Sequence, residues 1–242
     1  MILGHYGIAF AAKRVAPRTS LGTFAFAAQW LDELWPILVL AGVERVRVAP
    51  GLMAANPLDF EYYPYSHSLA GAIVWSVLLG GIYFGIRRDR RSATVVGLLV
   101  LSHWLLDAPM HRPDLPLWPG STTRIGLGAW RSIPLTIFLE LAVFGFGLVV
   151  YLRTTRARDR VGSWALWAMV AVLLLIFVSG FTSAPPPNGR AVALGALGLW
   201  LFVPWGYWID RHRELTGPGS SLHELPPRAA ADAPGSPSSR RP

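Results

Sequence analysis

Two short stretches of the chain place histidine and carboxylate side chains at the edges of apolar segments. One contains His67 between Ser66 and Ser68, and the other contains His103 and Asp107. Because residues four apart lie on one face of a helix, His103 and Asp107 could both reach one metal ion. Ionisable groups are costly inside a membrane and usually mark function there. The pattern therefore predicts a site, and metal binding is its first candidate chemistry.

The composition predicts an integral membrane protein and limits the ligands that a metal site could use. Of the 242 residues, 52% are hydrophobic and only 15% are charged. The chain has no cysteine, so any metal must be held by His, Asp or Glu. The net charge is +8, but the basic residues form short clusters between apolar runs. Such clusters set membrane topology, so no nucleic-acid partner is expected.

The apolar segments predict an all-α, polytopic helical membrane protein. A helix needs about 20 residues to cross the hydrocarbon core. About six full spans are expected, at residues 21–43, 67–86, 94–108, 133–152, 164–181 and 191–209. The apolar run at residues 1–12 is too short for a simple crossing, so we expect an N-terminal half-span helix.

The basic residues predict the orientation of these spans. The connections fall into two alternating sets, which carry thirteen and six Lys and Arg residues. The positive-inside rule places the richer set in the cytoplasm. We therefore expect a multi-pass protein of a bacterial-type inner membrane, with the N-terminus outside and the C-terminus cytoplasmic.

Two long connections and a polar tail complete the expected organisation. Residues 44–66 and 109–132 are longer than ordinary connections, which usually indicates function or disorder. From residue 214 the chain is rich in Pro, Ala, Ser and Gly. We expect a helical membrane domain at 1–213, with the metal site within 1–140, and a disordered cytoplasmic tail at 214–242.

The predicted topology brings the ionisable residues to similar depths. His5, His67, His103 and Asp107 all approach the outer leaflet. Three more residues lie roughly 10 to 15 Å below its boundary at 1.5 Å per residue: Asp32, Glu33 and Glu140. Adjacent residues cannot share one helix face, so at most one of the Asp32–Glu33 pair should point at the site.

Each of these residues also has a simpler interpretation. Alone, His5 would be an ordinary interfacial histidine, and His103 with Asp107 would be a hydrogen-bonded pair on one helix. In the segment from His111 to Asp114 the polar residues are expected to order a loop or contact a substrate. The neutral imidazoles and carboxylates together suit zinc, manganese or iron, which activate water for hydrolysis. A serine nucleophile at Ser66 or Ser68 is a weaker alternative, because no G-x-S-x-G element is present.

The motifs resemble those of the YdjM-like family, described as membrane-bound, metal-dependent hydrolases and as LexA-binding, inner-membrane-associated hydrolases. The resemblance covers about residues 1 to 115. It rests on Gly4-His5-Tyr6-Gly7, on Asp32 in an apolar helix, on Ser66-His67-Ser68 and on His103 with Asp107. The chain looks closest to a sub-group with Pro57-Leu58-Asp59-Phe60 and His111-Arg112-Pro113-Asp114.

The resemblance implies a ligand set and a substrate class. Its metal ligands carry over to His5, Asp32, His67, His103 and Asp107. Where the family often has a His-Arg pair before its second histidine, this chain reads Tyr62-Tyr63. Arg112 could then bind a phosphate or carboxylate in place of the missing arginine.

These expectations combine into one hypothesis about function. It is metal-dependent hydrolysis of a membrane-associated ester, first of all a phosphoester of a lipid or lipid-linked head group. Zinc is the first choice of metal, with manganese or iron as alternatives. Asp32 and Asp107 are the catalytic candidates, Asp32 as general base or as a bridge to a second ion. Glu140 is expected to orient a histidine ligand, and His111, Arg112, Ser66 and Ser68 are expected to contact substrate.

Two other classes of function stay open. An ion or proton transporter could use the same residues as a pathway, although the polar set stops near mid-membrane. Alternatively, the His/Asp cluster could merely stabilise a structural membrane protein.

Overall fold

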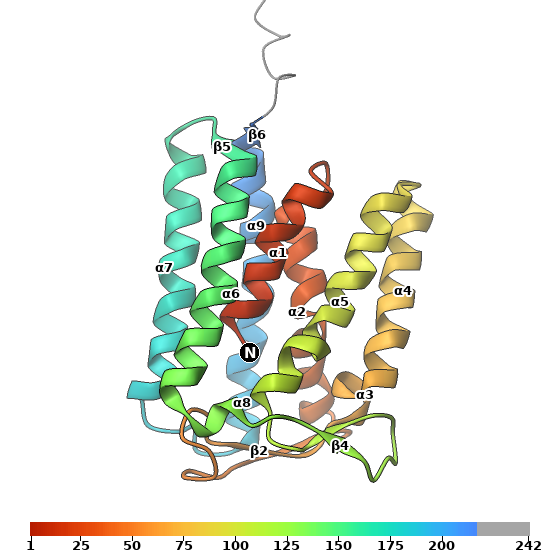
Figure 1. Cartoon of the computed structure of the whole chain (residues 1–242), viewed down its shortest axis with the longest axis vertical. Coiled ribbons are helices and arrows are strands. Elements are labelled where there is room, and N and C mark those ends of the chain that lie inside the picture. The colour runs from red at the N-terminus through yellow and green to blue at the C-terminus, as the bar shows by residue number, and fades with distance from the viewer. Residues whose placement is uncertain (217–242) are drawn as a thin grey trace, which may run out of the picture.

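The computed structural model describes residues 1–216, and most of them are helical (Figure 1). The helices are α1 (Leu3–Val15), α2 (Leu21–Leu40), α3 (Pro64–His67), α4 (Leu69–Arg87), α5 (Arg90–Met110), α6 (Ile133–Thr154), α7 (Arg160–Thr182), α8 (Gly189–Ala196) and α9 (Phe202–Arg211). Two 3₁₀ segments accompany them, η1 (Ala129–Arg131) and η2 (Leu197–Leu201). The expected all-α membrane fold is confirmed.

Five of the described helices are long and apolar enough to cross a membrane. They are α4, α5, α6, α7 and the continuous segment Gly189–Arg211, which comprises α8, η2 and α9. They match five of the six expected spans. The remaining span is α2, which is 20 residues long but carries Gln29, Asp32 and Glu33 and falls outside this set. Gln29 and Glu33 are buried and Asp32 is largely buried, so these polar side chains face the interior of the bundle.

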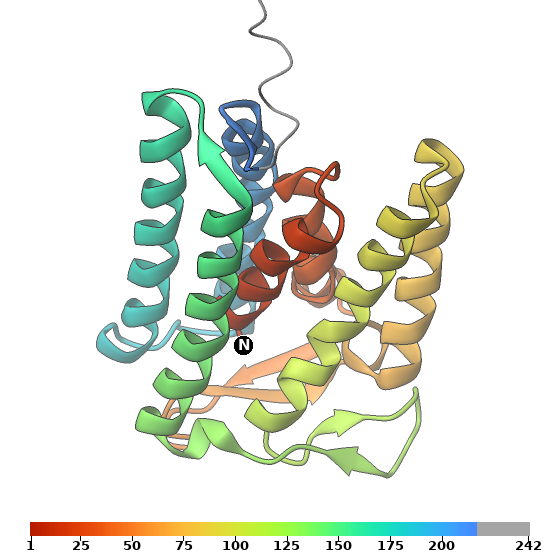
Figure 2. The ribbon, with the colours of Figure 1, turned by 45° about the horizontal axis from the view of Figure 1, so that its top comes forward.

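Helix α1 lies at the centre of the bundle and starts inside it (Figures 1 and 2). It has 13 residues and packs against α2 and α6. The approach to α6 is close because both helices present glycine: a Cβ on Gly147 would lie 1.8 Å from the Gly7 carbonyl oxygen. A side chain at either position would push α1 away. This close crossing sets the position of His5.

Short antiparallel strands close the two ends of the bundle, where the sequence predicted only loops. At one end β1 (Arg45–Val48) pairs with β2 (Leu58–Tyr62), and β3 (Leu115–Pro116) pairs with β4 (Arg124–Ile125). We call this the loop end. At the opposite end β5 (Thr155–Ala157) pairs with β6 (Arg213–Leu215).

The boundaries of two expected elements differ from the structure. Helix α5 continues through Pro109 to Met110, whereas the predicted span stopped at residue 108. The predicted tail begins at 214, but Glu214 and Leu215 form β6 with β5, so folded structure continues past that boundary. The rest of the predicted tail, residues 217–242, lies outside the described residues.

Candidate metal centre

Helix α5 and the residue that caps its C-terminal end present three ionisable side chains in line toward the centre of the bundle. Asp107 Oδ2 lies 3.3 Å from His103 Nε2 and 3.9 Å from His111 Nε2. The three residues are spaced by four, so a helix stacks them on one face. His111 joins the row because α5 extends past Pro109 and His111 caps it, with its backbone N–H bonded to the Asp107 carbonyl.

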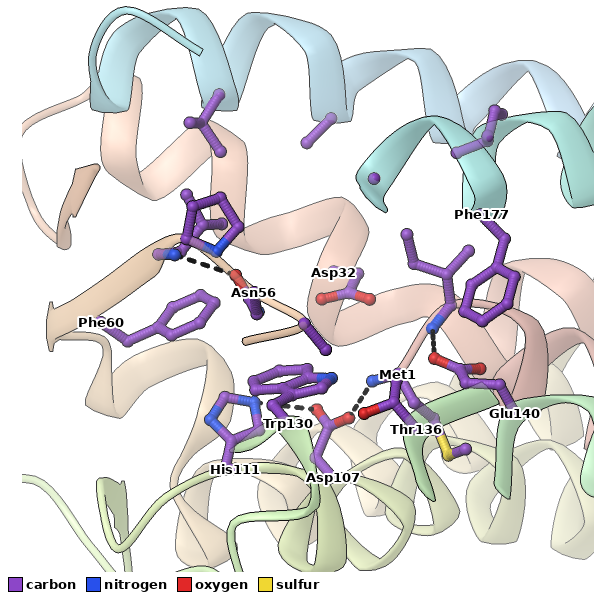
Figure 3. A pocket seen from close by; sticks show the side chains of 18 of the residues that line it. Met1, Asp32, Asn56, Phe60, Asp107, His111, Trp130, Thr136, Glu140 and Phe177 are labelled. Carbon is purple, nitrogen blue, oxygen red and sulfur yellow. Dashed lines mark hydrogen bonds and ion pairs between the residues drawn. The ribbon is translucent and has the colours of Figure 1, made fainter. Parts of the chain in front are cut away.

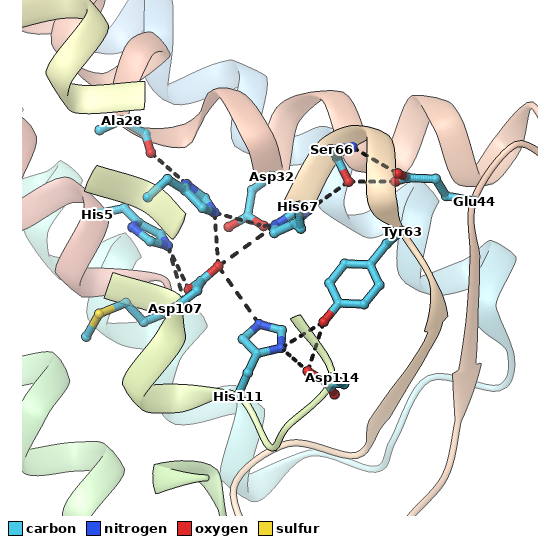
Figure 4. A network of polar contacts seen from close by, with 12 residues as sticks. His5, Ala28, Asp32, Glu44, Tyr63, Ser66, His67, Asp107, His111 and Asp114 are labelled. Carbon is cyan, nitrogen blue, oxygen red and sulfur yellow. Dashed lines mark hydrogen bonds and ion pairs between the residues drawn. The ribbon is translucent and has the colours of Figure 1, made fainter. Parts of the chain in front are cut away.

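Helices α2 and α3 bring a second carboxylate and a third histidine to the same place (Figure 4). His67 Nε2 lies 3.3 Å from Asp32 Oδ1 and 3.9 Å from Asp107 Oδ2. Asp32 Oδ1 is also 3.6 Å from His103 Nε2. Its neighbour Glu33 points elsewhere, and both of its carboxylate oxygens are buried without a hydrogen-bond partner among residues 1–216. Only one of this pair therefore serves the cluster.

The Nδ1 atom of His67 is held by a short hydrogen-bonded chain. Ser66 Oγ donates to Glu44 Oε2 at 2.6 Å and lies 2.8 Å from His67 Nδ1. Since the hydroxyl proton goes to Glu44, Ser66 Oγ accepts the Nδ1 proton of His67. Glu44 is buried and also accepts the backbone N–H groups of Tyr65 and Ser66. The Nε2 atom of His67 is therefore left with a free lone pair.

The other two histidines have the same arrangement. His103 Nδ1 donates to the Ala28 carbonyl oxygen at 2.8 Å. His111 Nδ1 lies 2.9 Å from Asp114 Oδ1 and donates to it. Fixing the proton on Nδ1 leaves the lone pair on Nε2, and a metal ion can then bind the ring through Nε2.

In the resulting geometry, hydrogen-bond acceptor atoms of the imidazoles face acceptor oxygens of the carboxylates. Three Nε2 lone pairs face Asp107 Oδ2 or Asp32 Oδ1 at 3.3 to 3.9 Å. These separations are close to the distance of about 3.3 Å between two ligand atoms of a tetrahedral zinc ion. His103 Nε2 is buried and makes no hydrogen bond to any described residue. A cation between Asp32, His67 and His103, whose ligand atoms lie within 4.8 Å of one another, would satisfy these atoms, so the donor set fits a divalent metal.

His5 approaches Asp107 from the other side. Its ring stacks on His103 with centroids 3.6 Å apart, and its Nε2 is 3.2 Å from Asp107 Oδ1. The amino group of Met1 also pairs with Asp107 Oδ1 and lies 3.3 Å from His5 Nε2. The positively charged amino group of Met1 thus faces Asp107 Oδ1, whereas Asp107 Oδ2 faces imidazole lone pairs. Two groups of three residues each have ligand atoms that all lie within 4.8 Å of one another. One group is His5, His103 and Asp107, and the other is Asp32, His67 and His103.

Glu140 acts on this site through the backbone of α1. Its two carboxylate oxygens accept the N–H groups of Ile2 and Gly4, at 3.0 and 2.9 Å. These are unpaired donors of a helix N-terminus, where a carboxylate is favoured. Glu140 therefore anchors the start of α1 and with it His5, and its hydrogen bonds within residues 1–216 go to this backbone and not to the histidine ring expected from the sequence.

Three residues expected to contact substrate are hydrogen-bonded or ion-paired to other parts of the protein. Arg112 pairs with Asp59 and donates from Nε to Asp114 Oδ2 at 3.1 Å, away from the cavity described below. Ser68 caps α4 by accepting the Gly71 N–H. Ser66 links Glu44 to His67 through two hydrogen bonds. These contacts support the loop end, the start of α4 and the ring of His67.

Asp114 is a supporting carboxylate outside the spanning helices. Burial opposes its ionisation, but hydrogen bonds from His111, Tyr63 and Arg112 outweigh burial, and the pKa of Asp114 is lowered. Burial and the nearby charge of Asp114 raise the pKa of the Tyr63 hydroxyl, which donates to Asp114 at 2.8 Å. Asp114 thus stays ionised, which favours the Nδ1 proton of His111.

The cluster forms part of the wall of a cavity of about 280 Å³ (Figure 3). Its polar residues are Asp32, His67, Asp107, His111, Glu140, Thr136 and Asn56. The rest of its lining is largely apolar and includes Trp35, Phe60, Trp130 and Phe177. A ligand in this cavity would place a polar group at the histidines and an apolar part among aromatic and aliphatic side chains.

Sequence comparison identifies the family. Residues 63–184, half of the chain, match the family model described as YdjM inner membrane protein. The chain belongs to the YdjM inner membrane protein family. The matched YdjM region includes His67, His103, Asp107 and His111 and ends two residues after α7. It leaves out His5 and Asp32, which the sequence analysis had included in its resemblance. No curated protein and no solved structure matches.

Sequence reasoning missed Glu44 and the place of His111 among the ligand atoms. A signal existed for His111, because it follows Asp107 by four residues as Asp107 follows His103. The proline between them suggested that the helix had ended. No local signal pointed to Glu44, which lies in an extended connection and reaches Ser66 only through the tertiary fold.

Proposed function

We propose that this membrane protein is a metal-dependent hydrolase of a membrane-associated ester, first of all a phosphoester of a lipid or lipid-linked head group. The observation that supports it most is the arrangement of three imidazole Nε2 lone pairs around Asp107 Oδ2 and Asp32 Oδ1. Nδ1 hydrogen bonds hold all three rings in the ligating tautomer. This set borders an apolar cavity.

In this proposal the residues of the cluster would bind the metal ion. His67, His103, His111, Asp107 and Asp32 would hold the ion, with His5 on the far side of Asp107. Zinc suits this nitrogen and oxygen donor set, and manganese or iron would also be accepted. The metal would supply Lewis acidity toward a phosphoryl or carbonyl oxygen and toward an attacking water.

Asp32 is the carboxylate best placed to take a proton. Its side chain is 24% exposed, whereas that of Asp107 is 2% exposed, and Asp32 lines the cavity. A carboxylate that faces both the cavity and the ligand atoms can accept a proton from water as general base. Asp107, buried between His5 and His103, is better placed to hold charge than to exchange protons.

The metal content of the purified protein tests the first step of this proposal. We expect the wild type in detergent to retain stoichiometric zinc, manganese or iron, measured by elemental mass spectrometry. His67→Ala, His103→Ala and His111→Ala should each lose most of it. His212→Ala is the matched control, because His212 pairs with Asp159 at the opposite end of the bundle and should leave the metal content unchanged.

The result is decisive in both directions. Wild-type protein without stoichiometric metal, or full retention by all three variants, would refute the metal centre. If the metal is present, phosphate release from lipid phosphoesters should depend on it, and no turnover with any such substrate would leave the cluster as a structural site.

A further inference from the structure

One side wall of the cavity is formed by two segments that do not close against each other. From α7 the cavity is lined by Ile176, Phe177, Gly180 and Phe181, and from α8 and η2 by Val192, Ala196 and Leu199. All seven are apolar. They belong to segments that are long and apolar enough to span a membrane, so their side chains suit contact with lipid chains.

The connection between α7 and α8 keeps them apart at the loop end. Helix α7 ends at Thr182, and α8 begins at Gly189 with Asn188 as its cap. Residues 185–187 are three consecutive prolines, which cannot continue a helix and favour an extended backbone. Figures 1 and 2 show this connection crossing from α7 to α8.

Exposure indicates that the wall is open sideways. Ile176 is 36% exposed, and Gly180 is exposed as well. A Cβ built on Gly180 would meet no atom within 4 Å, although Gly180 lines the cavity. The space beside Gly180 is therefore free, and the cavity that Gly180 lines is also lined by His67, Asp107 and His111.

We propose that this opening admits one alkyl chain of a lipid substrate, which enters sideways between α7 and α8 and places its anionic head group at the histidine cluster. This inference rests on the proposed function and specifies its substrate class as a chain-bearing amphiphile. The apolar wall matches the chain, and the polar groups gathered at His67, Asp107 and His111 match the head group. A water-soluble ester would leave the apolar part of the cavity unused.

A pair of phosphonates separates chain binding from head-group binding. Dodecylphosphonate and methylphosphonate share a non-hydrolysable head, and only the first has a chain. Binding to zinc-loaded protein in nanodiscs should be at least about tenfold tighter for dodecylphosphonate, because burying methylenes is favourable.

Filling the opening should remove this preference. Gly180→Phe should weaken dodecylphosphonate binding about tenfold and change methylphosphonate binding by less than about twofold. Gly81→Phe is the control: Gly81 is exposed in the middle of α4, a Cβ there also meets no atom, and it does not line the cavity. It should leave both affinities unchanged. Ala196→Phe narrows the same opening from the opposite wall and serves if Gly180→Phe does not fold.

The possible outcomes distinguish this inference from the proposed function. Zinc-dependent binding of both phosphonates that Gly180→Phe and Ala196→Phe leave intact would overturn the chain site and keep the metal centre. An equal loss in the Gly81→Phe control would also overturn it. If neither phosphonate binds in a zinc-dependent way to any variant, the proposed function fails and the chain site fails with it.

Discussion

At the scale of single residues, the site depends on side chains that do not face the cavity. The two carboxylate oxygens of Glu44 accept hydrogen bonds from the Ser66 hydroxyl and from the backbone of α3. Ser66 in turn accepts the Nδ1 proton of His67 and so holds its ring. Partners of this kind fix the ring orientation and the tautomer of a metal-binding histidine. Asp114 does the same for His111, and the Ala28 carbonyl does so for His103.

Removing the support of His67 should weaken metal binding without removing a ligand. We expect Glu44→Gln and Ser66→Ala to lower the affinity for zinc by about 10- to 100-fold, measured by competition with a chromogenic chelator. Glu61→Gln is the control, since Glu61 pairs with Arg47 on the surface of the loop end. Affinities within about twofold of wild type in both test variants would show that Glu44 has no part in holding His67.

At the scale of elements, α1 is the helix whose placement matters most. Its start is held by Glu140 of α6, and its last turn is held by Lys13, which donates to Asp210 Oδ2 at 2.6 Å. Asp210 also accepts the Leu21 N–H and the Tyr151 hydroxyl. This one carboxylate therefore ties α1, α2 and α6 to α9 near the opposite end of the bundle.

Breaking that junction should destabilise the whole bundle. In Asp210→Asn the buried Lys13 ammonium loses its counter-charge, which costs roughly 3 kcal/mol. Unfolding in detergent mixtures, followed by circular dichroism, should show the loss. Asp159→Asn removes an exposed partner of His212 and should have a much smaller effect. Equal stability of the two variants would mean that the Lys13–Asp210 pair contributes little.

At the scale of the whole molecule, the charge pattern predicts which end faces the cytoplasm. The connections rich in arginine lie at the end that contains β5 and β6, and the histidine cluster lies toward the loop end. The positive-inside rule then predicts that the loop end, and with it access to the site, faces the outer side of the membrane.

The absence of cysteine makes this orientation simple to measure. In intact spheroplasts a membrane-impermeant maleimide should label Thr122→Cys, which is exposed at the loop end. Ser163→Cys, exposed in the first turn of α7 at the opposite end, should react only after lysis. The reverse pattern would place the site on the cytoplasmic face.

The sequence by itself determined the helices, the membrane setting and one face of the site. These follow from local patterns: apolar runs long enough to span, and His103 and Asp107 one helical turn apart. It also singled out His5, Asp32 and His67, which the structure brings to the same cluster. It did not indicate the partners of Arg112 and Glu140, because Asp59 and the backbone of Ile2 lie far from them in the chain.

Only the tertiary structure decided which atoms face one another. Glu44 reaches Ser66 across 22 positions, and Asp32 of α2 reaches His103 of α5. The side wall of the cavity at α7 and α8 depends on the distance between these two segments, which no local pattern encodes. Local sequence sets the periodicity of each helix, whereas the rotation and separation of helices follow from close packing between segments distant in sequence, as Gly7 and Gly147 show.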